Sequence, residues 1–363
     1  MAAQQALSIV AAGVCTPVGL SLPEAAASAR GRVARLREIA WRDRRFEPFI
    51  VGSVPDAGLP PLADALASLP LQYREARMLR IAQVALEDLF GLAGGAAALG
   101  ISTECPLPLL LGLPEHHTTL PLDRRAFVQR LAAQTGLPLD LAHSVAVPRG
   151  RAAALMALGE AATRLHRGDV PFVLVGGVDT LVDLYVLGTL DMEGRVRNEV
   201  TSDGFSPGEG AGFVLLCTPA TAQKHALKPL ALIAGSASGQ EPGHLYSEEN
   251  YLGEGLAQTF ATLLADAPPP APIACVYASF NGERYWAREY GVARLRAAAA
   301  FEPDHAVEHP AEVFGDLGAA HGPVLLALAA HAVAEGYRRA PCLVFASSDH
   351  GDRAAALLVK QAA

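Results

Sequence analysis

The sequence lacks the features that would place the chain in a membrane, outside the cell or on a nucleic acid. No uncharged apolar run is long enough to cross a bilayer. Residues 1–10 contain no basic segment followed by an apolar core and a cleavage site, so we expect no signal peptide. The net charge of −8 predicts no binding to nucleic acid or anionic membranes. We therefore expect a cytoplasmic protein without a nucleic-acid or membrane partner.

Cysteine is also scarce, and its spacing excludes several site types. The five cysteines are far apart, odd in number and without a CxxC pair, which predicts free thiols in a reducing compartment. His116 and His117 have no third ligand at a useful spacing, so a solvated loop is favoured over a metal site. The glycines 208, 210 and 212 do not join a strand to a helix as a dinucleotide-binding loop would. We expect neither a metal nor a cofactor.

What is present is a large apolar core in a chain of 363 residues. Hydrophobic residues make up 51% of the sequence and charged residues only 18%, with a mean hydropathy of +0.25. Strand-like and helix-like segments alternate, which indicates an α/β protein. The clearest helices are 73–92 and 124–135, the second opened by Asp123 and closed by Gly136.

The strand and helix pattern in the first part of the chain returns in the second. We therefore predict two halves, 1–220 and 221–363, packed as one compact body. Pro303 and Pro310 argue against a helix that would align His305 with His309, so we expect a solvated acidic loop there. The predicted strands are 7–14, 107–113, 144–147, 172–175, 212–217, 230–234, 273–278 and 342–346, and the further helices are 151–166, 251–264, 286–300 and 317–334.

Several segments, in order along the chain, resemble the β-ketoacyl synthases of the thiolase-like superfamily. They are 13–19 (GVCTPVG), 174–179 (LVGGVD), 203–212 (DGFSPGEGAG) and 317–320 (LGAA). The resemblance implies an α/β thiolase-like fold of two similar halves, each a mixed five-stranded sheet, in five αβαβα layers. It also implies a homodimer joined through an edge strand, which we place at Phe172–Val175. Gly208, Glu209, Gly210 and Gly212 are expected to form a structural turn beside the active-site region.

The same resemblance implies that the catalytic residues have been replaced. Arg151 stands where the family has its nucleophilic cysteine, Asn281 where it has its first histidine, and Gly315 where we place the second. Arginine stays protonated and cannot act as a nucleophile. The Gly-rich C-terminal turn of the family has become a polar, charged one, residues 347–353. No catalytic residue can be assigned with these replacements.

If the fold is right, six polar residues converge near one point and form the pocket: Arg151, Asn281, Glu283, Asp316, Asp349 and His350. An arginine at a buried helix start meets the positive end of the helix dipole and needs a carboxylate partner. We predict that Arg151 pairs with Asp316 or Asp349 and plugs the pocket. The alternative is that the aligned segments are shifted by a residue or two and these are surface charges. We interpret the basic run Trp41–Arg45 as a solvated face. The alternative is that it contacts a carrier protein or another partner.

Three functions remain open. The one we favour is an inactive ketosynthase-like protein that serves as a binding, scaffold or chaperone-like accessory dimer for a protein partner. The resemblance suggests a bacterial secretion or acyl-carrier pathway, and chain-length-factor subunits show that the synthase fold can lose its cysteine and still serve as a partner. The second is an acyltransferase of the 3-oxoacyl synthase class that works without the cysteine. The third is a hydrolase built on Asp349 and His350, with His321 and either Ser279 or Ser347.

Overall fold

The structure is a computed structural model that describes residues 6–115 and 121–361. Ten strands form one continuous mixed sheet, and its two five-stranded parts have the same order and pairing sense. From the outer edge inward, the first part runs β5 (Val145–Val147), β4 (Leu109–Gly112), β6 (Val173–Thr180), β7 (Glu209–Cys217) and β1 (Leu7–Cys15). The second runs β10 (Phe301–Glu308), β9 (Ile273–Ala278), β11 (Cys342–Ser347), β12 (Asp352–Val359) and β8 (Ala231–Gln240).

In each part the three outer strands are parallel, and the two inner strands pair antiparallel to their neighbours. The two parts meet where β1 pairs with β8 over three residues, Leu7 to Ile9. The mixed α/β architecture of two similar halves is therefore confirmed. The division at residue 220 stays a prediction, and it falls within the short helix α8 (Pro219–Lys224).

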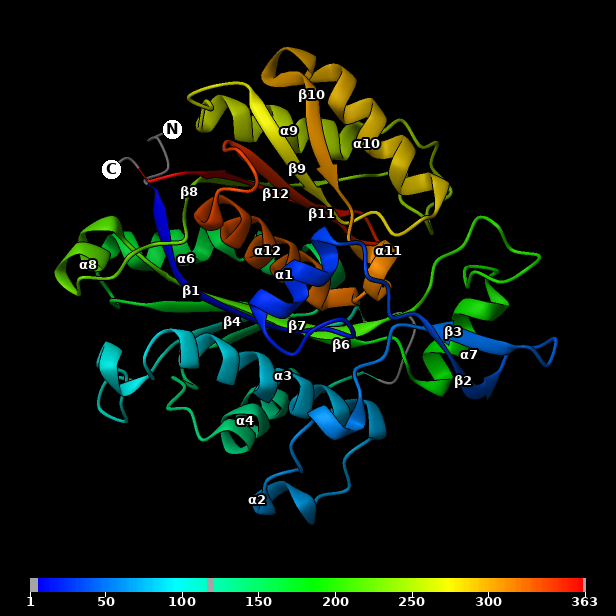
Figure 1. Cartoon of the computed structure of the whole chain (residues 1–363), viewed down its shortest axis with the longest axis horizontal. Helices are drawn as coiled ribbons and strands as arrows, with labels where there is room; N and C mark the ends of the chain where they lie inside the picture. Colours follow the sequence, from blue (N-terminus) through cyan, green and yellow to red (C-terminus); the bar gives the residue numbers. More distant parts are fainter. Residues whose placement is uncertain (1–5, 116–120, 362–363) are drawn as a thin grey trace.

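Helices cover the two parts of the sheet in layers (Figure 1). The outer layer of the first half is α3 (Tyr73–Leu92) with α4 (Arg124–Thr135), and that of the second half is α9 (Glu254–Asp266) with α10 (Arg284–Arg296). The layer between the sheets consists of α1 (Leu22–Arg30), α5 (Ala153–Met156), α6 (Leu158–Arg167) and α12 (His321–Glu335).

The apolar cores follow from the alternation of side chains along the strands. In β7, Val214 and Leu216 face the central helices, whereas Phe213 and Leu215 face α3. The central cluster includes nearly the whole of α12, which is apolar on all sides because it lies between two sheets. Close packing of these layers leaves no room for a side chain at Gly212, where a Cβ atom would lie 2.7 Å from the Val324 nitrogen.

A third, smaller unit projects from the first half beside the sheet (Figure 1). The hairpin of β2 (Arg37–Arg42) and β3 (Pro48–Val51) forms a separate two-stranded sheet. It shares a small apolar core with α7 (Leu184–Met192). The remaining short elements are α2 (Asp64–Ala67), α11 (Ala311–Phe314) and 3₁₀ turns at 56–58, 97–99, 150–152, 298–300 and 318–320.

Three expectations about local structure were wrong. The segment Phe172–Val175 belongs to β6, which is paired on both sides and is therefore not an edge strand; β5 forms that edge. Gly210 and Gly212 lie with Glu209 in strand β7 and form no turn. Residues 301–308 form the edge strand β10 instead of a loop, because a parallel edge strand tolerates Pro303 and exposed charged side chains.

No helix among residues 6–115 and 121–361 is both long enough and apolar enough to span a membrane.

Candidate functional site

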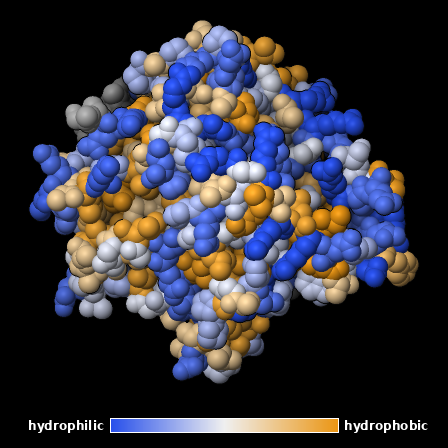
Figure 2. Space-filling view, in the orientation of Figure 1, coloured by the Kyte–Doolittle hydropathy of each residue, from blue (hydrophilic) through white to orange (hydrophobic). Residues whose placement is uncertain are grey.

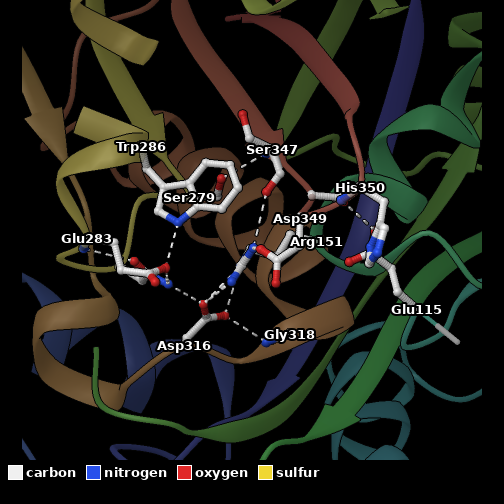
Figure 3. Close-up of polar contacts among 12 residues, drawn as sticks. Glu115, Arg151, Ser279, Glu283, Trp286, Asp316, Gly318, Ser347, Asp349 and His350 are labelled. Carbon is white, nitrogen blue, oxygen red and sulfur yellow. Dashed lines mark hydrogen bonds and ion pairs between the residues drawn. The ribbon is translucent and has the colours of Figure 1, made fainter. Parts of the chain in front are cut away.

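Arg151 lies in the turn Gly150–Ala152, directly before α5, and only 5% of its surface is exposed. Its guanidinium group contacts two carboxylates from different parts of the chain (Figure 3). Nε and Nη2 donate to Asp316 Oδ2 at 2.8 and 2.6 Å, and Nη1 donates to Asp349 Oδ1 at 2.6 Å. The predicted ion pair is present, and it involves both of the acids considered rather than one.

A second arginine, which the sequence reasoning missed, completes the arrangement. Arg195 Nη1 donates to Asp349 Oδ2 at 2.7 Å, and Arg195 Nε donates to Glu283 Oε1 at 2.8 Å. Asn281 Nδ2 donates to Asp316 Oδ2 at 2.7 Å and to Glu283 Oε2 at 3.2 Å. We call the six residues Arg151, Arg195, Asn281, Glu283, Asp316 and Asp349 the ion cluster. No motif surrounds Arg195 in the sequence, so only its position after α7 reveals this role.

The charged side chains of the ion cluster pair with one another. Burial alone would raise the pKa of Asp316, but the guanidinium of Arg151 and the contact with His321 together outweigh burial and hold that pKa well below its usual range. Burial would likewise raise the pKa of Asp349, and Arg151 and Arg195 together lower it. The carboxylates in turn overcome the effect of burial on Arg151 and raise its pKa. Arg151 therefore remains a cation, which can bind an anion but cannot attack a thioester.

The residue that faces Arg151 and Asn281 is Asp316 and not Gly315. Gly315 ends the short helix α11 with φ +80°, and a Cβ atom there would lie 2.7 Å from the Ser206 carbonyl oxygen. Asp316, by contrast, is fully buried and accepts a hydrogen bond from the Gly318 nitrogen at 2.9 Å. The expectation for Gly315 stays a prediction, and on this geometry we propose that Asp316 occupies the position of the second histidine instead.

His350 lies at the border of the ion cluster rather than within it. Its ring stacks on Tyr246 at 4.9 Å between centroids, and Nδ1 lies 3.5 Å from Glu115 Oε1. The hydrogen bond that His350 donates to the Glu115 carboxylate raises the pKa of His350, although partial burial opposes the effect. His116 and His117 lie outside the described residues. No group of three or more metal-ligating side chains that could hold a metal occurs in the part of the chain that the structure describes.

The geometry gives no support to the hydrolase. The acid of the suggested triad, Asp349, is occupied by two arginines. Ser347 Oγ donates to Glu289 Oε2 at 2.5 Å, and Ser279 Oγ accepts from the Ser347 nitrogen at 3.0 Å. His321 is fully buried, with Nδ1 3.5 Å from Asp316 Oδ1 and Nε2 without a partner among the described residues. Activation of a serine nucleophile requires a hydrogen bond from its hydroxyl to a histidine. The hydroxyls of Ser279 and Ser347 contact other groups instead.

Two empty spaces adjoin the ion cluster. A narrow cavity of about 50 Å³ lies between Arg151 and the first half of the chain, with Asp179 and Phe205 in its wall. A wider cleft of about 290 Å³ opens beside Asn281 and Glu283, with Phe280 and Arg197 in its lining. The narrow cavity has room for one or two water molecules, so a substrate group reaching Arg151 would have to displace part of the ion cluster.

The buried cysteines provide no substitute nucleophile. All five are free, and only Cys105 is exposed. Burial raises the pKa of Cys15 far above its ordinary value and raises that of Cys217 to about 12. The pKa of the Cys275 thiol is raised further by its hydrogen bond with Cys342 and by burial. A thiolate is the reactive form, so these buried thiols are inert at neutral pH.

The first residue of β7 carries a second, separate ion pair. Glu209 is fully buried and accepts hydrogen bonds from Arg77 Nε and Nη2, both at 2.6 Å. It also accepts from the Val54 nitrogen at 2.7 Å and from Thr180 Oγ1 at 2.8 Å. This carboxylate ties α3 and the segment after β3 to the sheet, so its role is structural.

Comparison with known families matches residues 132–222 to the N-terminal domain of β-ketoacyl synthases. These residues include β5, the Arg151 turn, β6 and β7. A phenolphthiocerol/phthiocerol polyketide synthase of Mycobacterium tuberculosis is 35% identical over 105 residues, which are 27% of this chain and 6% of that protein. Pikromycin polyketide synthase component PikAIII of Streptomyces venezuelae is 36% identical over 94 residues, 24% of this chain and 6% of that protein. The match thus spans about 6% of the length of these curated relatives.

Solved structures extend the likeness to the whole chain and define the class of fold. A ketosynthase in complex with its type II acyl-carrier protein matches with a TM-score of 0.79, at 16% identity and over 99% of this chain and 100% of that one. A ketosynthase domain of the Bacillus subtilis bacillaene synthase has the same TM-score at 14% identity, over 99% and 73% of the two chains. The ishigamide ketosynthase/chain length factor follows at 0.76 and 16%, over 99% and 100%.

The protein therefore has the thiolase-like fold of ketosynthases. Within this fold, residues 132–222 resemble the N-terminal domain of β-ketoacyl synthases.

Proposed function

We propose that this chain is a catalytically inactive ketosynthase-like protein that acts by binding a protein partner, as a scaffold or accessory protein. The observation that carries the proposal is the position of Arg151. It begins the helical segment that the family uses for its nucleophile, and it is held there by Asp316 and Asp349 at 2.6 Å each. Arg151, Asn281 and Asp316 take the place of the cysteine and the two histidines in this proposal.

The three replacements, Arg151, Asn281 and Asp316, stabilise one another. A decarboxylating condensation needs a thiolate and donors for the oxygen atoms that become negative. Asp316 offers an acceptor where a donor is required, and Asn281 already donates to Asp316 and Glu283. The arginine, the amide and the carboxylate thus satisfy one another instead of a substrate. A single replacement would leave an unpaired buried charge, so the three support each other.

The proposal includes a dimer joined at the outer edge of the first half. The strand that can pair there is β5, whose far side is free of other strands among the described residues. Val145 and Leu141 are 43% and 44% exposed at this edge, and an unpaired strand edge favours pairing with a second chain. The dimer contains either two copies of this chain or one copy and an active synthase. Sedimentation of the purified chain distinguishes these, because only the first predicts a dimer of the chain alone.

The second candidate is an acyltransferase without the cysteine, and the cleft of about 290 Å³ beside Asn281 is the observation that favours it. The test is turnover with malonyl and longer acyl thioesters, followed by release of free thiol and of CO₂. Our proposal predicts no release above the uncatalysed background. Release that the Asn281→Ala variant abolishes would establish the acyltransferase and overturn the proposal.

A restored variant makes the test more direct. Arg151→Cys, Asn281→His and Asp316→His together would return the family's residue types to the three positions. Acyl transfer by this triple variant, with the native chain silent, supports the assignment of the positions. A triple variant that folds, binds no acyl group and reacts no faster than the native chain contradicts that assignment.

A further inference from the structure

The tip of the β2–β3 hairpin, residues 42–47, has a fixed shape. Asp43 is only 8% exposed, and its carboxylate accepts from the backbone nitrogens of Arg45 and Glu47 at 2.8 and 2.9 Å. The Arg42 side chain donates to the Phe46 carbonyl oxygen at 2.7 Å. The tip is also attached to the body of the protein, because the Arg44 nitrogen donates to Asp191 at the end of α7. We call residues 42–47 the hairpin tip.

Phe46 stands out within the hairpin tip for two independent reasons. Its side chain is 80% exposed, the largest exposure among the exposed large hydrophobic side chains in the described residues. Its φ is +68°, a left-handed conformation that glycine and asparagine adopt easily and a bulky residue does not. Glycine would fit the turn better and would remove an apolar surface from water. A strained, exposed aromatic residue on a well-ordered turn is the kind of feature that persists for function.

The surroundings of Phe46 are mainly basic, with three exposed arginines against one exposed acid, Glu47, although the whole chain carries a net charge of −8. Arg42, Arg44 and Arg45 are exposed on the same short turn. Among the salt bridges within the described residues, only that of Arg44 with Asp191, at 3.7 Å, involves these three side chains. Met192, which follows Asp191, is 77% exposed and adds a second apolar side chain near the tip. Figure 2 shows apolar and strongly hydrophilic side chains side by side at this end of the molecule.

We infer that the hairpin tip is a docking surface that inserts Phe46 into an apolar pocket with an acidic rim on a protein partner. Aromatic residues and arginines are the types that dominate binding energy at protein interfaces, with the aromatic ring buried and the charges around it. The basic collar complements an acidic rim and guides its approach. The basic side chains are confined to three arginines around one aromatic ring on a chain of net charge −8, which fits a single pocket on a protein better than an extended anionic membrane surface. This inference does not depend on whether the ion cluster is inactive.

The test uses the full chain and a displayed library of random peptides as the probe. We expect the selected peptides to combine acidic residues with apolar ones. Their binding should fall about tenfold or more in Phe46→Gly and in Arg45→Glu. The matched control is Arg124→Glu, which reverses an exposed arginine at the start of α4, where the helix dipole tolerates an acid. Arg124→Glu should leave binding unchanged.

Phe46→Gly also separates docking from a structural role. If Phe46 served the fold, its removal would lower the melting temperature. Our inference predicts the opposite combination, a melting temperature that is unchanged or raised and binding that is lost, because glycine relieves the backbone at φ +68°.

Two outcomes would overturn the inference. One is a set of selected peptides that bind Phe46→Gly and Arg45→Glu as tightly as the native chain. The other is sedimentation with phosphatidylglycerol vesicles that Phe46→Gly abolishes, which would assign the hairpin tip to a membrane instead of a protein.

Discussion

The ion cluster predicts a large effect from a single truncation. Arg151→Ala removes the cation that contacts Asp316 through two nitrogen atoms, and Asp316 is fully buried. Asp349 keeps Arg195 as its partner, so Asp316 bears most of the cost. Breaking a buried ion pair by removing one partner costs about 3–5 kcal/mol, because the remaining charge is uncompensated. For a chain of 363 residues this corresponds to a fall in melting temperature of about 4–7 °C.

The pH dependence of the effect identifies its cause. In the native chain the pKa of Asp316 is held well below its usual range. Its contribution to stability is therefore complete above the unfolded pKa of about 3.9 and is lost only as the pH falls through the lower folded pKa. In Arg151→Ala we expect burial to outweigh the remaining contacts of Asp316, including that with His321, and to raise its pKa above the unfolded value. The folded variant then binds more protons than the unfolded chain, so its stability falls as the pH rises.

Urea unfolding at about pH 5 and about pH 7.5 measures both effects, because the unfolded carboxyl is mainly ionised at both. The difference in free energy of unfolding between native chain and variant should be larger at the higher pH. The matched control is Arg164→Ala, which breaks a surface pair of similar length with Glu160, 2.7 Å, whose side chain is 53% exposed, together with an exposed hydrogen bond to the His143 carbonyl oxygen. That pair is worth about 0–1 kcal/mol. The reasoning is refuted if Arg151→Ala costs no more than Arg164→Ala, or if its cost does not grow with pH.

Three further predictions rest on local contacts. Gly13→Ala should abolish soluble folded protein in an expression assay, because the added Cβ would lie 2.2 Å from the Ala85 carbonyl oxygen in α3. Gly159→Ala, whose Cβ meets open space, should instead stabilise the fold by about 0.5–1 kcal/mol in urea unfolding. Equal yields of the two variants would contradict this. Titration with a thiol reagent should modify one cysteine per native chain, Cys105, and all five after denaturation; more than one rapidly reacting thiol would be inconsistent with the burial of the other four. By NMR, His350 should titrate above its ordinary pKa of about 6.5, and its pKa should be lower in Glu115→Gln. The charged form of His350 therefore stabilises the fold below about pH 6.5, and this contribution is lost as the pH rises through the folded pKa. An unchanged pKa in Glu115→Gln would exclude Glu115 as the cause.

The fold was largely predictable, because long amphipathic segments and end signals carry their own information. The helices 73–92 and 124–135 and the strand 273–278 were predicted with the bounds that the structure has. The misses are elements whose partners are distant in sequence. Residues 301–308 contain proline and several charges, and only pairing with β9 makes them a strand. An apolar run such as 172–175 is typical of a buried strand but does not reveal whether it lies at an edge or in the centre.

The candidate site was predictable only in part. The electrostatic cost of a buried arginine at a helix start predicted that Arg151 would have a carboxylate partner, and the structure supplies Asp316 and Asp349. The role of Arg195 depends on where α7 ends in space, which no local pattern reveals. Our proposal of Asp316 in place of the expected Gly315 differs by one residue, and one residue decides whether a position has a side chain at all. Chemistry at a site is therefore predicted less securely than the elements that carry it.

The most direct test of the central claim is the intact mass of the purified chain after incubation with acyl-carrier and acyl-CoA thioesters. The account predicts an unchanged mass, because Arg151 fills the position from which a nucleophile would attack and the four buried thiols are out of reach of the thioesters. A stable increase by the mass of the acyl group, mapped to a residue of the ion cluster or to its border, would contradict the account and show that the site still transfers acyl groups.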